Sequence, residues 1–302
     1  MSKTLVTGGA GFIGSNLVDE LIKQGHEVLV LDNLSTGKKE NLNPKAKFVQ
    51  ADITNLEQIK PHFVGIDYVF HLAALPRVQW SIENPIETHN VNINGTLNVL
   101  LAARDAKVKR LVYSASSSAY GDTQVLPLKE DLLPMPMSPY GLHKYVGEHY
   151  TRLFSLLYGL ETVSLRYFNV YGPRMAFEGA YVTVIARFLE QKREGKKMTI
   201  TGDGTQTRDF TYVSDVVAAN ILAATGNRAG KGEVFNIGAG ANYSVNTIAK
   251  KLGGEYEYIA PWIEPHDTLA DNLKARNLLD WNPQIDLEQG LKKTVEWFEG
   301  LK

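Results

Sequence analysis

Residues 7–14 of the chain read Thr-Gly-Gly-Ala-Gly-Phe-Ile-Gly, after a short apolar run at Lys3–Thr7 and at the start of an amphipathic one, Gly11–Gln24. Glycines in such a segment let the backbone turn tightly, approach a pyrophosphate and pack a helix closely on a strand. The first N–H groups of the helix have no partner within it and point at the phosphates, together with the positive end of the helix dipole. The segment therefore predicts a strand, a phosphate-binding turn and a helix.

The second apolar run, Glu27–Leu31, is followed directly by Asp32. A carboxylate at this place accepts hydrogen bonds from the adenosine ribose hydroxyls and repels a ribose 2′-phosphate. The pattern predicts a dinucleotide site that prefers NAD to NADP, a preference that the nearby Lys38 and Lys39 would soften. The alternative is a glycine turn that merely joins a strand to a helix.

Short apolar runs alternate with longer amphipathic ones throughout the first half of the chain. This alternation predicts an α/β fold, a doubly wound parallel sheet covered on both faces. The expected strands are Lys3–Thr7, Glu27–Leu31, Lys47–Val49, Tyr68–Leu72, Arg110–Ser114 and Thr162–Arg166, and the expected helices are Gly11–Gln24, Asn55–Pro61, Pro85–Ala106 and Ser138–Tyr158.

The rhythm breaks after Arg166. A helix to about Glu194, a short helix from Ser214, a strand at Val234–Ile237 and two C-terminal helical stretches are expected there. We therefore expect an NAD-binding domain at residues 1–168, with parts of 209–238 added to it. Residues 169–302 would form mainly a smaller α/β lobe that binds the substrate.

Composition excludes several classes of protein. The chain has 302 residues, a net charge of −1 and no cysteine. Nucleic acids and anionic membranes require clustered Lys and Arg, so neither is expected as a partner. Disulfides and thiolate sites are excluded, and no metal-ligand spacing appears. No apolar run approaches the about 20 residues of a membrane span, and Met1–Lys3 leaves no room for a signal peptide, so a cytoplasmic protein is expected.

Tyr140 and Lys144 stand at i and i+4 of the expected helix Ser138–Tyr158, on one face of it. Alone the pair is a weak indication, because this spacing is common by chance. The hydroxyl-rich run Ser114–Gly121 strengthens it, since it follows the fifth strand at the edge where α/β sheets bind ligands. A free phenol has a pKa of about 10, so a tyrosine base requires a pKa lower by roughly three units, about 4 kcal/mol. A neighbouring ammonium and the positive ring of NAD⁺ would supply this.

The glycine segment, the Ser116 region, Tyr140-x-x-x-Lys144 and the segment Tyr-Phe-Asn-Val-Tyr-Gly-Pro at 167–173 together resemble the extended short-chain dehydrogenase/reductases, in particular the NAD-dependent epimerase/dehydratase family. The resemblance runs from residue 3 to the C-terminal helices and implies a Rossmann-type sheet with bound NAD. It implies that Tyr140 is the base, that Lys144 tunes it and holds the nicotinamide ribose, and that Ser116 hydrogen-bonds the reacting oxygen. The cofactor contacts that it implies are Gly8, Gly11, Phe12, Ile13, Gly14, Asp32, Asn33, Asp52, Ile53, Leu72, Ala73, Ala74, Asn92, Ser114, Tyr140, Lys144 and Tyr167.

A UDP-sugar site is also implied by the resemblance. Asn169 would meet the sugar diphosphate and Arg208 would clamp it; the alternative for Arg208 is a surface arginine paired with Asp209. Many relatives carry a second phosphate arginine before a Leu-Ala-Asp motif, but residues 262–268 contain none, and Arg174 is a candidate to compensate. The other expected substrate contacts are Ser116, Ser117, Tyr140, Ala180, Tyr181 and Val182.

Thr268 stands where the family's epimerases set the width of the pocket. A small residue there leaves space for an N-acetyl group, whereas the alternative role is helix capping.

The residues after Ser116 separate the reactions of the family. Its dehydratases carry an acidic pair where this chain has Ser117 and Ser118, and its decarboxylases generally carry Glu at the second of these places. A 4-epimerase of UDP-hexoses, plain or N-acetylated, needs neither and is favoured. A reductase, a divergent dehydratase or decarboxylase, and a non-catalytic NAD-binding scaffold are the alternatives. The resemblance also implies a homodimer, joined through Pro85–Ala106 and Ser138–Tyr158 as a four-helix bundle.

Overall fold

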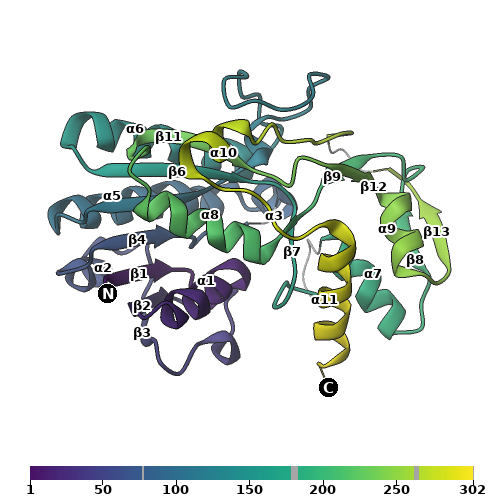
Figure 1. The fold of residues 1–302 in the computed structure, drawn as a ribbon, viewed down its shortest axis with the longest axis horizontal. Coiled ribbons are helices and arrows are strands. Elements are labelled where there is room, and N and C mark those ends of the chain that lie inside the picture. The colour runs from purple at the N-terminus through teal and green to yellow at the C-terminus, as the bar shows by residue number, and fades with distance from the viewer. Residues whose placement is uncertain (77, 178–182, 262–264, 302) are drawn as a thin grey trace.

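Seven parallel strands form the central sheet of the computed structural model, which describes residues 1–76, 78–177, 183–261 and 265–301 (Figure 1). The strand order reverses between β1 and β4, which marks the place where sheets of this type bind ligands. The predicted fold class is confirmed. Across the sheet the strands are β11 (Lys231–Ile237), β6 (Glu161–Tyr167), β5 (Arg110–Ser116), β4 (Tyr68–His71), β1 (Lys3–Thr7), β2 (Glu27–Asp32) and β3 (Lys47–Gln50).

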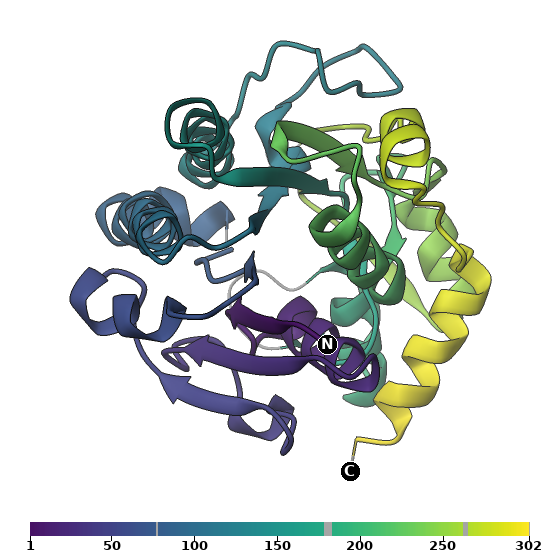
Figure 2. The same cartoon turned by 60° about the vertical axis from the view of Figure 1, so that its left-hand side comes forward.

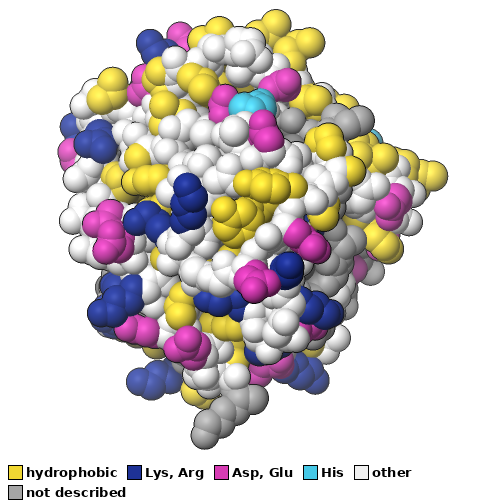
Figure 3. Space-filling view, turned by 90° about the vertical axis from the view of Figure 1, so that its right-hand side faces the viewer, with side chains coloured by type: hydrophobic (Ala, Val, Ile, Leu, Met, Phe, Trp, Pro, Cys, Tyr) yellow, Lys and Arg dark blue, Asp and Glu magenta, His cyan; other side chains and the backbone are white. Residues whose placement is uncertain are grey.

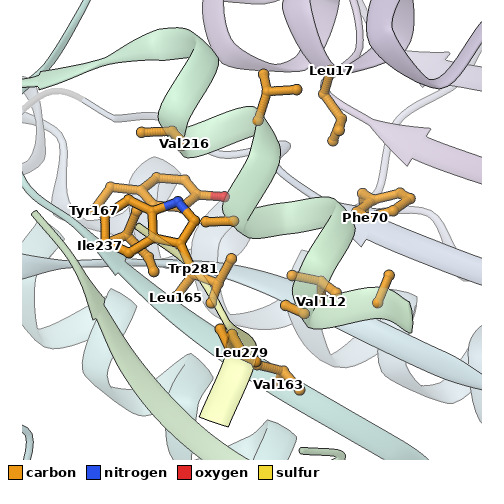
Figure 4. Packing of buried hydrophobic residues seen from close by; sticks show 14 of the residues in the cluster. Leu17, Phe70, Val112, Val163, Leu165, Tyr167, Val216, Ile237, Leu279 and Trp281 are labelled. Carbon is orange, nitrogen blue, oxygen red and sulfur yellow. The ribbon is translucent and has the colours of Figure 1, made fainter. Parts of the chain in front are cut away.

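Helices cover both faces of the sheet (Figures 1 and 2). On one face lie α1 (Phe12–Lys23) and α8 (Val213–Thr225), and on the other α5 (Gly95–Asp105) and α6 (Pro139–Tyr158). Figure 4 shows the hydrophobic core between the sheet and the helices α1 and α8. Leu17 of α1 and Val216 of α8 lie there over Phe70 and Leu165 of the sheet. Each such side chain, when fully buried, contributes about 1.5–3 kcal/mol to folding. This double burial explains the nearly continuous apolar strands of the sequence.

A second group of elements comes mainly from the C-terminal half. It has its own core, in which Ile185, Phe188, Ile200 and Ile248 are buried. On its outer face, basic and acidic side chains are interspersed with apolar ones (Figure 3). Its paired strands are β8 (Met198–Thr201) with β13 (Tyr256–Ile259), β9 (Thr207–Asp209) with β12 (Asn242–Ser244), and β7 (Val170–Tyr171) with β10 (Thr211–Tyr212); its helices are α7 (Val184–Arg193), α9 (Val245–Leu252) and α11 (Leu287–Glu299), and α10 (Leu273–Leu279) packs on the central sheet.

The helix expected at Pro85–Ala106 is one helical run with an irregular middle. It consists of α4 (Pro85–His89), a π-helical turn η3 (Asn90–Asn94) and α5. The wide turn contains Asn92, whose side chain accepts a hydrogen bond from Leu75 N at 2.8 Å and donates one to Leu75 O at 3.1 Å. Such turns are single insertions in α-helices and are frequent at functional sites.

Other boundaries differ from the sequence expectation. The helix expected to be short from Ser214 spans 13 residues as α8, and the strand expected from Val234 begins at Lys231. Asn55–Pro61 divides into α2 (Leu56–Ile59) and a 3₁₀ turn, η2 (Lys60–Phe63). A short helix, α3 (Val78–Glu83), was not expected at all. The remaining 3₁₀ turns are η1 (Lys39–Asn41) and η4 (Ser117–Ala119). Among the described helices, none is long and apolar enough to span a bilayer.

His71 ends β4 beside the switch point and is 1% exposed. The Thr96 hydroxyl donates to Asn92 O at 2.7 Å, so it accepts from His71 Nε2 at 3.0 Å, and Thr7 Oγ1 donates to His71 Nδ1 at 2.8 Å. Burial, aided by the Lys144 charge, lowers the pKa of His71 to about 3. The imidazole is therefore a neutral link between β1, β4 and the helical run.

This link predicts a loss of stability in acid. In the unfolded chain His71 titrates near pH 6.5, so between about pH 6.5 and 3 only the unfolded chain binds the proton. Its contribution is fully present above that range and is lost as the pH falls through it, by about 3 kcal/mol at pH 4. In urea unfolding at pH 7 and pH 4, His71→Gln is expected to reduce the acid-induced loss by about this amount. The control His62→Gln should leave the loss unchanged, and an equal loss in His71→Gln would contradict the prediction.

Candidate active site

A cavity of about 540 Å³ runs from the glycine segment to the second group of elements. It lies at the carboxyl edge of the central sheet and brings together residues from both halves of the chain. The predicted site residues that line it are Gly8, Gly11, Phe12, Ile13, Gly14, Asp32, Asn33, Ile53, Leu72, Ala73, Ala74, Ser114, Ser116, Ser117, Tyr140, Lys144, Tyr167, Asn169 and Arg208.

Three predicted residues lie behind the wall of the cavity instead of lining it. Asp52 Oδ2 accepts a hydrogen bond from the Asn33 amide at 2.9 Å. Asn92 holds both backbone polar groups of Leu75, and Thr268 Oγ1 accepts from the Asn169 amide at 3.3 Å. Each therefore acts on the cavity through a neighbour that lines it. Ala180, Tyr181 and Val182 lie outside the described residues.

The glycine segment is too crowded for other side chains. Gly8 has a φ of +73°, and a Cβ on it would lie 2.7 Å from Ala73 N. A Cβ on Gly14 would lie 2.2 Å from the Gly8 carbonyl oxygen. Gly11, the N-cap of α1, brings no side chain to cap the helix. The backbone can therefore approach a pyrophosphate closely.

The other half of the dinucleotide site is built around Asp32, which is 7% exposed. Its two carboxylate oxygens accept from Ala10 N at 3.0 Å and Leu34 N at 2.8 Å, which fixes the carboxylate at the cavity wall. Lone pairs remain on both oxygens for ribose hydroxyls. Together with the glycine segment, Asp32 makes the residues present fit NAD. Ser35 and Thr36 also line this end, and no motif indicated them.

Ser116 and Tyr140 face the cavity from neighbouring elements. Ser116 ends β5, and its hydroxyl donates to Ser118 Oγ at 3.0 Å and accepts from Ser118 N at 3.2 Å. Tyr140 lies in the first turn of α6, where the Ser138 hydroxyl accepts from Gly141 N as the N-cap. Tyr140 N donates to Ser81 Oγ at 3.0 Å, which ties this turn to α3.

Burial determines the electrostatics of this wall in the protein itself. It raises the pKa of Tyr140, because a buried phenolate loses hydration, and a hydrogen bond with Ser116 only partly opposes this. The lowering of this pKa expected with the positive ring of NAD⁺ stays a prediction. Lys144 Nζ donates to Ser114 O at 2.6 Å, and burial lowers the pKa of Lys144 to about 7 against the opposing charge of Glu148.

The far end of the cavity contains a cation that was expected and one that was not. Arg208 Nη1 donates to Thr207 O at 2.8 Å and His266 O at 2.9 Å. The alternative partner, Asp209, is buried, and its carboxylate accepts from three backbone N–H groups, those of Ala239, Gly240 and Ala270. Arg187 of α7 also lines the cavity, and no sequence motif indicated it.

Arg174, the residue considered as a compensating cation, lies elsewhere. Its guanidinium forms an ion pair with Asp19 at 2.7 Å and is not part of the cavity wall.

Comparison with known proteins gives consistent matches over nearly the whole chain. Residues 4–238 match the model of the NAD dependent epimerase/dehydratase family. The chain is 43% identical to a putative UDP-glucose 4-epimerase of Methanocaldococcus jannaschii, over 98% of both chains. It is similar to the structure of a UDP-glucose 4-epimerase from Thermotoga maritima with UDP-glucose, at a TM-score of 0.94 and 42% identity over 99% of both chains. A UDP-N-acetylglucosamine 4-epimerase from Methanobrevibacter ruminantium M1, in complex with UDP-N-acetylmuramic acid, matches at a TM-score of 0.94 and 35% identity over 100% of this chain and 99% of that one.

The crowding at Gly14 predicts that Gly14→Ala loses the cofactor. The added Cβ would collide with backbone, so the turn must shift away from the pyrophosphate position. We expect NAD binding to weaken at least tenfold, from the loss of close backbone contacts of about 1.4 kcal/mol or more. NAD content after purification and calorimetric titration with NAD measure this, with circular dichroism as a check on folding.

Gly300→Ala, at the end of α11, is the matched control, because its added Cβ would lie no closer than 3.3 Å to other atoms. Equal NAD affinity in Gly14→Ala and the control would show that the close approach does not determine the site.

Proposed function

The chain belongs to the NAD dependent epimerase/dehydratase family, and we propose that it interconverts UDP-hexoses that differ at C4, through a transient 4-keto sugar and with tightly held NAD. The observation that carries the proposal is the wall formed by Ser116, Tyr140 and Lys144, whose neighbours among the described residues that line the cavity bear hydroxyl groups and no carboxylate. The pairs that we propose are UDP-glucose with UDP-galactose, and UDP-N-acetylglucosamine with UDP-N-acetylgalactosamine.

The side chains of this wall are suited to moving the proton of the reaction. Tyr140, as phenolate, takes the proton of the C4 hydroxyl, while the Ser116 hydroxyl donates a hydrogen bond to the same oxygen. A phenolate at Tyr140 would raise the pKa of Lys144 from about 7, so that the ammonium places positive charge beside it. NAD, held by the glycine segment and Asp32, would supply the hydride acceptor and donor at C4. The 4-keto sugar would turn over in the cavity between the two transfers, so that the configuration at C4 inverts. Tyr140 then gives its proton back to the C4 oxygen, so that atoms and charge balance over the cycle.

The acidic and basic side chains that line the cavity argue against the dehydratase and decarboxylase reactions of the family. Among the described residues that line the cavity, Asp32 is the one carboxylate, and it lies at the dinucleotide end. Ser117 and Ser118 beside Ser116 cannot act as the carboxylate acid or base that elimination of water requires. A reductase would need exchangeable NADH, and a non-catalytic scaffold would not need Tyr140 and Lys144 together.

The proposal includes room for an N-acetyl group near Asn169. Thr268 lies behind the wall and accepts a hydrogen bond from the Asn169 amide, so a small residue at this place leaves Asn169, which lines the cavity, without a bulky side chain pressing on it. The similarity to a UDP-N-acetylglucosamine 4-epimerase supports the same substrate class.

Proton NMR of the purified protein tests the reaction directly. Mixed separately with UDP-glucose and UDP-N-acetylglucosamine, without added cofactor, the protein is expected to produce the galacto-type anomeric signal of each product. Tyr140→Phe should lower the rate by about 10²–10⁴-fold, because it removes the group that transfers the proton. Tyr145→Phe, on the same helix but outside the cavity wall, is the control. No new signal with either sugar, even after NAD is added, would overturn the proposed reaction.

We also propose that the protein is a homodimer, joined through α4–α5 and α6. Leu142, Leu153 and Leu156 share one side of α6 by helical spacing, and they are 48%, 44% and 75% exposed. Ile86, on the neighbouring α4, is 86% exposed. A stripe of this kind matches the apolar face of a helix in a bundle and is costly to leave in water.

Sedimentation at micromolar concentration should therefore show a dimer. Leu153→Glu combined with Leu156→Glu should shift it to monomer, because the interface would bury two carboxylates. Val64→Glu, at an exposed apolar residue far from α6 in the sequence, should leave the dimer intact. A monomer in the unmodified protein would refute this arrangement.

A further inference from the structure

The charges of the cavity divide between its two ends. Among the described residues that line it, the anion is Asp32, at the dinucleotide end, and the cations are Lys144, Arg187 and Arg208. Lys144 is committed to Ser114 O at the edge of the sheet. The two guanidinium groups therefore lie at the other end, where Asn169 and Arg208 are expected to meet the sugar diphosphate.

Gln191, one turn after Arg187 in α7, joins this helix to strand β8. Gln191 Nε2 donates to Thr199 Oγ1 at 2.8 Å, and Gln191 Oε1 accepts from Thr199 N at 2.9 Å. Residues at i and i+4 share one side of a helix, so Arg187 lies on the side of α7 that faces β8. In β8, Met198 and Ile200 are buried, and the alternate residues Thr199 and Thr201 line the cavity.

The segment that carries Arg208 is joined to the other end of the same strand by Gln206. Gln206 Nε2 donates to Thr201 O at 2.9 Å and to Thr201 Oγ1 at 3.2 Å. Arg208 follows two residues later, and its hydrogen bonds to two backbone carbonyls restrain the guanidinium. The hydroxyl-bearing side of β8 thus lies between the elements that carry the two arginines.

The segment before Leu269, where related proteins carry their second phosphate arginine, contributes no cation to the cavity in its described part. His266 Nδ1 and Asp267 Oδ2 are 2.9 Å apart. Asp267 Oδ1 in turn accepts from Thr207 N at 3.1 Å and Thr207 Oγ1 at 2.6 Å. Both side chains are thus engaged with each other and with β9. Arg174 is paired with Asp19 and does not line the cavity, so Arg187 is the other guanidinium beside Arg208 among the described residues that line this end.

We propose that Arg187 is this second cation, and that Arg187 and Arg208 together hold the diphosphate of the uridine nucleotide. The inference rests on the proposed function, because it takes UDP as the nucleotide part of the substrate. Guanidinium groups form paired, charge-assisted hydrogen bonds with phosphate oxygens, and two of them match the two phosphate groups. The second clamp of this chain comes from α7 instead of from the segment before Leu269.

Calorimetric titration of the NAD-loaded protein with UDP, and NMR titration with uridine, test the assignment. Arg187→Gln is expected to weaken UDP binding about tenfold to a hundredfold and to change uridine binding less than threefold, because uridine lacks both phosphates. Arg187→Lys should fall between, since it keeps the charge but loses the planar pair of donors. Arg193→Gln is the matched control, because Arg193 lies on the same helix, 49% exposed and paired with Glu190.

The outcomes separate this inference from the proposed reaction. Weakening of UDP and uridine to the same extent, or of neither, would overturn the role of Arg187. A selective loss of UDP affinity in a protein that converts no UDP-hexose would keep the role and discard the reaction. Conversion of UDP-hexoses by the protein, together with unchanged UDP affinity in Arg187→Gln, would support the proposed reaction and overturn the role of Arg187. No binding of UDP by the unmodified protein would overturn both.

Discussion

The close approach of backbone to backbone at the switch point is the constraint on which the rest of the site depends. Gly8 leaves β1 with a positive φ, beside Ala73 at the end of β4, and Gly14 lies against the Gly8 carbonyl oxygen. The start of α1 and the first residues after β4 are thereby brought to one point. The sheet carries Ser116 and Tyr167 at the ends of β5 and β6, so these two residues of the cavity wall are positioned relative to the same point.

A buried ion pair joins α6, the helix that carries Tyr140 and Lys144, to the central sheet. Arg166 donates to both carboxylate oxygens of Glu148, at 2.8 and 2.7 Å, and both side chains are 3% exposed. The Arg166 guanidinium also lies 4.5 Å from the centre of the Tyr120 ring, in the segment after Ser116. Burying such a pair costs desolvation, and removing one partner leaves a charge without compensation. Glu148 lies one helical turn beyond Lys144. The pair thus joins this part of α6 to β6 and to the serine segment.

Local patterns in the sequence were sufficient for the sheet, the glycine turn and most of the cavity wall. Strands that are buried on both faces appear in the sequence as nearly continuous apolar runs. Gly8 and Gly14 appear as a glycine motif, because no other residue fits at these two places. The two-stranded pairs of the C-terminal half were missed because strands such as Thr207–Asp209 are too short to show a period and pair with distant partners. The π turn depends on the contact of Asn92 with Leu75, and Arg187 reaches the cavity through the packing of α7 on β8. Neither can be inferred from residue spacing.

The position of β11 has a consequence for how the chain folds as it is synthesised. This strand completes the edge of the sheet against β6, yet it follows in the sequence after α7, β8 and β9 have been made. Until Ile237 has left the ribosome, β6 is an open edge with unpaired backbone groups, a condition that favours pairing with foreign strands. Part of the C-terminal half must therefore emerge before the central sheet is complete. The two halves of the chain thus reach their folded state together rather than one after the other.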